Sequence, residues 1–101
     1  MEATIRKEDD KHVTLILDGY FDTSATAQTE KEVEPLFQYH DCEIVIDCSR
    51  LEYISSSGLR LMMAINQRCQ ANQCALYIKG LQSKVKDVFM TTGFTNLFEF
   101  K

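Results

Sequence analysis

The sequence predicts an α/β domain with a mixed, mostly parallel central sheet of about five strands, an N-terminal antiparallel hairpin and three main helices. Two observations carry this prediction. From residue 43 onward, strand-like and helix-like segments alternate, and such an order implies parallel pairing through right-handed crossovers. Before residue 43, two short apolar runs are joined by a polar turn, which is the pattern of a hairpin.

Length and charge limit the class of protein. The chain has 101 residues, of which 45% are apolar, enough for one modest core, so we expect a single domain over residues 1–101. The net charge of −4 is spread over interspersed acidic and basic residues, which disfavours nucleic acid as a partner. No apolar run reaches about eighteen residues, the length of a membrane span. The charged N-terminus lacks a secretion signal, and we expect a cytoplasmic protein that does not insert into a membrane.

The first two strands are expected at Thr4–Lys7 and His12–Leu17. The second run alternates apolar and polar residues, and the polar residues 8–11 between the runs predict a hairpin with a longer turn. Asp18 and Gly19 predict a turn after the second strand.

A first helix is expected to start at Asp22–Ser24, where three consecutive residues can serve as the N-cap. Pro35 lacks an amide donor and disfavours helical angles at Glu34, so we expect a break near Glu34. The predicted apolar face of this helix has helical spacing and comprises Thr29, Val33, Leu36 and Phe37.

The middle strand of the sheet is expected at Glu43–Cys48. Three β-branched residues in succession, with no polar face, predict a central strand covered on both sides. A polar corner at Ser49-Arg50 should end it. Ser55–Ser57 then lie at the start of a second helix, whose apolar positions are Leu59, Met62, Met63, Asn66 and Cys69. We expect one of the two methionines in the core, while the other is free to line a partner surface.

The last elements follow the same alternation. Ala75–Lys79 is the next predicted strand, and Gly80 ends it. Ser83 should open a third helix, and Gly93 should close it in a left-handed conformation. Leu97–Phe100 is expected to form a short last strand.

The sequence offers few residues for a metal site or a redox-active site. Its four cysteines lack C-x-x-C spacing, and neither of its two histidines stands in a metal-binding pattern. We expect free thiols in a reducing compartment and no cofactor, with a disulfide or metal site as the alternative. These residues are Cys42, Cys48, Cys69, Cys74, His12 and His40.

The most unusual feature is the run of three serines followed by Gly58 at the start of an apolar helix. One serine suffices to cap a helix, so the simple interpretation is a cap and a tight turn. The alternative is an anion site, because helix N-termini present unpaired amides and a positive dipole end. The sequence lacks a G-x-S-x-G elbow and a nucleotide-binding G-x-x-x-x-G-K-[ST] loop, so a phosphate on these serines would have to come from another protein.

The block from Ile44 to Arg60, IVIDCSRLEYISSSGLR, resembles the signature of the STAS domain (sulfate transporter and anti-sigma factor antagonist). It is most similar to the free-standing bacterial anti-sigma factor antagonists. Gly19–Asp22 resembles the family's glycine-x-apolar-aspartate element, and Val85–Phe94 resembles its last helix and exit. The resemblance covers essentially the whole chain and implies the fold predicted above.

The resemblance also implies a site. In the family, the serine two residues before the signature glycine is phosphorylated by an anti-sigma factor that is also a serine kinase. This position is Ser56 here, with Ser57 as second choice, while Ser55 stands where the family usually has aspartate. Asp22 matches an aspartate near the acceptor, or serves as an N-cap, or both. Arg60 either pairs with a phosphate or an acidic partner, or is simply a solvated helix residue.

The implied function is that of a non-enzymatic anti-sigma factor antagonist. The unphosphorylated form would bind the anti-sigma factor and release the sigma factor, and phosphorylation would end the binding. A serine phosphatase is a further implied partner. The alternative is a STAS subunit or scaffold of a cytosolic or membrane-transport complex that is never phosphorylated. A kinase gene next to the gene of this protein would favour the antagonist, and neighbouring transporter genes would favour the scaffold.

Overall fold

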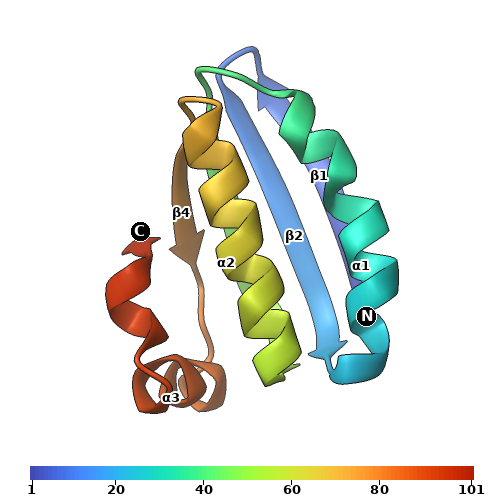
Figure 1. Ribbon diagram of the computed structural model, residues 1–101, viewed down its shortest axis with the longest axis vertical. Helices are drawn as coiled ribbons and strands as arrows, with labels where there is room; N and C mark the ends of the chain where they lie inside the picture. The colour runs from blue at the N-terminus through green and yellow to red at the C-terminus, as the bar shows by residue number, and fades with distance from the viewer.

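The computed structural model describes residues 1–101 and contains a five-stranded sheet in the order β1-β2-β3-β4-β5 (Figure 1). Only the β1–β2 pair is antiparallel, and the other three pairs are parallel, so the predicted mixed sheet with an N-terminal hairpin and a central third strand is confirmed. The strands are β1 (Glu2–Asp9), β2 (His12–Phe21), β3 (Glu43–Ile54), β4 (Ala75–Lys79) and β5 (Glu99–Phe100).

Three helices and three short 3₁₀ segments connect the strands. The predicted break at Glu34 is confirmed, because α1 ends at Val33 and a 3₁₀ segment containing Pro35 follows. None of the helices is long and apolar enough to span a bilayer. The segments are η1 (Thr23–Ala25), α1 (Thr26–Val33), η2 (Glu34–Gln38), α2 (Ser56–Ala71), α3 (Ser83–Thr91) and η3 (Phe94–Leu97).

The hairpin is longer and tighter than predicted. β1 continues to Asp9, which leaves only two residues in the turn, and β2 continues to Phe21. The predicted turn after Asp18-Gly19 is wrong. Gly19 has φ of 109° and lies inside β2, next to a shift in the β2–β3 register. The glycine therefore allows an irregularity within the strand and does not reverse the chain.

The prediction that the middle strand is covered on both faces is wrong. Ile44, Ile46 and Cys48 are buried, whereas the alternating Val45 and Asp47 are only half-buried. The helices α1 and α2 both lie over one face of the sheet (Figure 1). The β-branched run therefore reflects a strand with one fully buried face, and Val45 packs within a row of its strand neighbours on the open face.

The predicted corner at Ser49-Arg50 is instead the first of two irregularities in the pairing of a longer strand. β3 continues to Ile54, and its pairing with β2 shifts register twice along that stretch. At the first shift, Asp47 Oδ1 accepts hydrogen bonds from the Ser49 amide at 3.0 Å and the Ser49 hydroxyl at 2.7 Å. Polar residues whose side chains bond to the nearby backbone are also typical of turns, so the sequence here has the pattern of a turn although the strand continues.

The remaining elements follow the prediction except at their ends. Gly93 has φ of 79°, the predicted left-handed conformation. Ser83 is not the cap of α3, because Gln82 holds that position and Ser83 is the first helical residue. Leu97 belongs to η3 and is exposed, so the last strand is only two residues long. Met62 is fully buried and Met63 half-buried, as expected of one core methionine.

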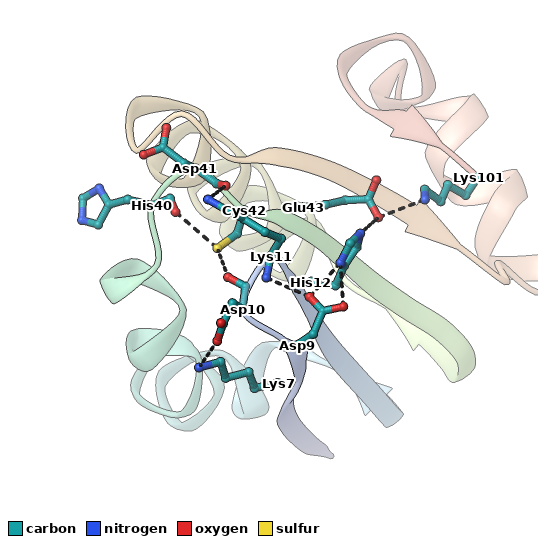
Figure 2. Close-up of polar contacts among 10 residues, drawn as sticks. All are labelled: Lys7, Asp9, Asp10, Lys11, His12, His40, Asp41, Cys42, Glu43 and Lys101. Atoms are coloured by element: carbon teal, nitrogen blue, oxygen red, sulfur yellow. Dashed lines mark hydrogen bonds and ion pairs between the residues drawn. The ribbon is translucent and has the colours of Figure 1, made fainter.

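At the amino ends of β2 and β3, exposed polar side chains join the hairpin turn to the sheet (Figure 2). His12 Nδ1 lies 2.8 Å from Asp9 Oδ1, and His12 Nε2 lies 3.8 Å from Glu43. Lys101 Nζ lies 3.1 Å from the same Glu43 carboxylate. These contacts tie the turn and the chain end to β3, and no three of the chain's His, Cys, Asp and Glu side chains are placed to share a metal ion.

Candidate functional site

The candidate site lies at the opposite end of the sheet, where β2 and β3 end. β2 leads through Asp22 into η1, and β3 leads through Ser55 into α2. The Ser55 amide donates to the Phe21 carbonyl at 2.8 Å, so the two chain exits lie side by side. This edge, at the carboxyl ends of parallel strands, is where open α/β sheets commonly bind their ligands.

The three serines occupy different environments. Ser55 is buried and extended, with φ of −86°, and its hydroxyl accepts from the Gly58 amide at 3.1 Å as the N-cap of α2. The half-buried Ser57 hydroxyl lies 3.0 Å from the Ser55 hydroxyl and 3.0 Å from Thr26 Oγ1. Ser56 alone is exposed. Two hydroxyls therefore hold the helix start, and the middle one faces solvent.

Gly58 is required by close packing at the start of α2. A Cβ at this position would lie 3.0 Å from Ile54 Cγ1 and 3.1 Å from the Phe21 ring. Both neighbours are fully buried side chains, so making room for a Cβ would disturb a close-packed core. The glycine lets the first turn of α2 rest directly on the ends of β2 and β3, which sets the position of the serines.

Asp22 is the N-cap of η1. Its Oδ1 accepts from the Ser24 hydroxyl at 2.7 Å and from the Ala25 amide at 3.0 Å. The Ser24 hydrogen bond is the main reason that the pKa of Asp22 lies below its ordinary value, and the Ala25 amide adds to the effect. The capping alternative for Asp22 is thus confirmed, and the backbone places this ionised carboxylate on the turn next to the serine turn.

Arg60 is exposed and lies four residues after Ser56, so the two side chains share one face of α2. It forms no ion pair within the chain, whereas Arg50 lies 3.7 Å from Asp18. The Arg60 guanidinium is thus available to a group placed on Ser56 or to a partner.

The buried thiols and the histidines lie outside this arrangement. All four cysteines are buried, and burial raises the pKa of Cys48 and of Cys69 to about 12, which keeps both thiols protonated. His12 and His40 lie at the far end of the sheet (Figure 2). The serines therefore have no adjacent base of the kind that activates a serine nucleophile.

A family model described as the STAS domain matches residues 3–101. The chain belongs to the STAS domain family. A Bordetella bronchiseptica protein named anti-sigma factor antagonist BtrV is 30% identical to this STAS domain over 98 residues, which make up 97% of this chain and 84% of that protein. The anti-sigma-B factor antagonist of Listeria monocytogenes is 26% identical over 98 residues, covering 96% of this chain and 85% of that protein.

Solved structures match the fold of this STAS domain. The anti-sigma factor antagonist SpoIIAA in its unphosphorylated form has a TM-score of 0.72 at 16% identity, covering 99% of this chain and 87% of that one. Its phosphorylated form also has a TM-score of 0.72, at 17% identity, covering 99% of this chain and 91% of that one. At such identities the match shows the shared mixed sheet and helices, and the predicted fold class is confirmed.

Two features of the STAS domain's serine end escaped the sequence analysis. Thr26 links α1 to the serine turn, but a threonine in a polar helix carries no signal of a contact 31 residues away. Tyr20 and Tyr53 form an exposed stacked pair beside the site. Each tyrosine stands directly before the last residue of a strand that leads into the site. That position was the only signal of the pair in the sequence.

Proposed function

We propose that this STAS domain is an anti-sigma factor antagonist that works as a phosphorylation switch. In its unphosphorylated form it binds an anti-sigma factor that is also a serine kinase, and so releases the sigma factor. The kinase transfers a phosphate to Ser56, which ends the binding, and a serine phosphatase restores the first state. The names of the two relatives support the antagonist function.

The exposure of Ser56 carries this proposal. A kinase needs an accessible hydroxyl, and Ser55 and Ser57 both use their hydroxyls in hydrogen bonds that hold α2 in place. Ser56 stands at the first residue of α2, where the helix dipole and the first-turn amides favour an added anion. Arg60, one turn further on, supplies a counter-charge on the same face.

Phosphorylation ends binding through charge at the interface. To transfer phosphate, a kinase must place the terminal phosphate of its nucleotide against the acceptor hydroxyl. Phosphoserine then adds about −1.5 to −2 charges facing an already anionic part of the partner. Like charges at an interface cost several kcal/mol, and a thousandfold loss of affinity needs only about 4 kcal/mol.

The protein itself acts by binding and not by catalysis. Both histidines lie at the other end of the sheet from the serines, and burial keeps the thiols of Cys48 and Cys69 protonated. Its partners are proteins and include neither nucleic acid nor a membrane, and no cofactor is needed. Because sigma factors act on RNA polymerase, the protein works in the cytoplasm.

The test is incubation of the wild type, Ser56→Ala and Ser57→Ala with the cognate kinase and ATP, followed by tandem mass spectrometry. We expect one phosphate on Ser56 of the wild type and of Ser57→Ala, and none on Ser56→Ala. Calorimetric titration should find that Ser56→Ala binds the anti-sigma factor even with ATP present, and that Ser56→Asp binds more weakly. A phosphate only on Ser55 or Ser57 would overturn the assignment.

One observation favours a second candidate, a scaffold subunit without phosphorylation. The Ser55 hydroxyl is fully engaged in capping α2, where relatives in this family usually have aspartate, so the serine run has a structural use. Intact-mass measurement of the protein from its native cells separates the two candidates. A population heavier by one phosphate supports the switch, and unmodified protein under all growth conditions supports the scaffold.

A further inference from the structure

Tyr20 and Tyr53 form an exposed aromatic pair at the serine end of the sheet. Their ring centroids lie 6.4 Å apart with an interplanar angle of 27°, and the residues are 55% and 45% exposed. The two are direct partners on β2 and β3. The other large apolar residues with such exposure, Met90, Leu97 and Phe100, come from α3 and the segment after it.

The backbone directs this pair away from the core. Phe21 and Ile54, the next residues on each strand, are buried under α2, so the tyrosines face the other side of the sheet. A register shift between Gly19 and Tyr20 brings Tyr20 opposite Tyr53. Bulges that redirect a side chain are common beside functional sites.

Negative charge gathers on the Tyr20 side of the pair. Tyr20 lines a shallow hollow together with the carboxylates of Glu2, Asp18 and Asp22, and the only positive group among its lining residues is the α-amino group of Met1. Asp18 has one ion pair, with Arg50 at 3.7 Å, and both side chains are largely exposed. A partner that covers the tyrosines must therefore bring positive charge to meet this rim.

We propose that the Tyr20–Tyr53 pair anchors the anti-sigma factor, through a basic surface whose arginine stacks on the tyrosine ring and reaches the carboxylates of the hollow. The inference rests on the proposed function. Tyrosine is enriched among residues that dominate binding energy, and arginine pairs both with aromatic faces and with carboxylates. The Ser55 amide bonds to the carbonyl of Phe21, so the anchor and the phosphorylated turn lie at the same end of the sheet.

This arrangement separates docking from switching. The basic surface meets the tyrosines and the acidic hollow, whereas the nucleotide phosphates of the kinase meet Ser56. Loss of the anchor should weaken binding of the unphosphorylated protein and raise KM for phosphorylation, with kcat little changed, because the acceptor itself is untouched.

The test is calorimetric titration of the cognate anti-sigma factor with the wild type, Tyr20→Ser/Tyr53→Ser and the matched control Met90→Ser/Leu97→Ser. We expect at least a roughly tenfold loss of affinity for the tyrosine variant and less than about a twofold loss for the control. Tyr20→Arg adds a positive charge and keeps a long side chain, so it should bind poorly at low salt and recover in part as salt rises.

Thermal melting separates docking from a structural role. The three variants should melt within a few degrees of the wild type, since all the changed residues are exposed. If the wild type and the tyrosine variant bind the anti-sigma factor with equal affinity, the anchor is overturned and the proposed function is left intact. If the wild type itself does not bind, the proposed function fails, and the anchor fails with it.

Discussion

The Ser57 hydroxyl lies 3.0 Å from Thr26 Oγ1, a contact that joins the starts of α2 and α1. The same Ser57 hydroxyl lies 3.0 Å from that of Ser55, which caps α2. Thr26 Oγ1 also lies 3.4 Å from the Asp22 carbonyl. One chain of hydroxyls therefore holds the two helix starts and leaves Ser56 outside it.

The first prediction concerns this chain of hydroxyls. Thr26→Val removes the partner of Ser57 and leaves the shape of the side chain nearly unchanged, so it should lower the free energy of unfolding by about 1 kcal/mol. Urea denaturation measures the loss. In a double-mutant cycle, Thr26→Val and Ser57→Ala should be non-additive because each removes the same contact. Additive losses would mean that the hydroxyls do not interact.

The second prediction is that Gly58→Ala destabilises the domain, against the usual trend. In an exposed helix, replacing glycine with alanine stabilises by about 1 kcal/mol. Here the new Cβ would meet Phe21 and Ile54 at 3.0–3.1 Å, and overpacking of a core costs about 1–3 kcal/mol. We expect a net loss in urea denaturation. Gln67→Ala, on the exposed face of the same helix, serves as the control and should change little. A more stable Gly58→Ala would contradict the packing argument.

The third prediction concerns the thiols. Because burial raises the pKa of Cys48 and of Cys69 to about 12, both remain neutral at pH 8 and react slowly. Iodoacetamide labelling followed by mass spectrometry should find both unmodified in the native protein and modified in urea. Rapid native labelling of either residue would show that its segment opens readily.

The order of elements followed from the sequence because apolar spacing reports which side of a segment meets a core. The alternation after residue 43 predicted the parallel strands, and Pro35 predicted the break after α1. The end of β3 was missed because Ser49 and Asp47 have the sequence pattern of a turn, while tertiary pairing with β2 continues the strand through bulges. A single sequence does not reveal which polar pair turns the chain and which only bends it.

The candidate site was located from the sequence, but its internal division was not. Three serines before a glycine marked a helix start, and the structure places them there. Which hydroxyl caps, which bridges and which is exposed depends on Thr26 and on the close approach of Phe21, contacts that come from distant parts of the chain. The tyrosine pair was missed for the same reason, because the bulge that aligns it depends on the β2–β3 register.

The fourth prediction is a pH dependence from Asp22. Its pKa in the folded protein lies below the ordinary value of 3.8, so the ionised cap stabilises the fold above that pH and the contribution disappears as the pH falls through the lower, folded value. Asp22→Ala should melt below the wild type at pH 7, and the gap should shrink in acid below about pH 3.8. Thermal melting across pH measures it. Asp22→Asn, which keeps an acceptor oxygen, is the control and should lose less.

The fifth prediction is that phosphorylation of Ser56 leaves the fold intact. Ser56 is exposed at the N-terminus of α2, where the helix dipole favours a phosphate, and Arg60 lies one turn away on the same face. The Asp22 carboxylate on the neighbouring turn opposes this through like-charge repulsion, which exposure and salt weaken. The two effects should nearly cancel and change the free energy of unfolding by no more than about 1 kcal/mol, small against the several kcal/mol available at a partner interface. Phosphorylated and unmodified protein should therefore melt within a few degrees of each other, while calorimetric titration finds a large difference in affinity for the anti-sigma factor.

Arg60→Gln tests the counter-charge, because it should lower the melting temperature of the phosphorylated protein more than that of the unmodified one. Loss of the cooperative melting transition on phosphorylation would instead mean that the switch acts by disrupting the domain.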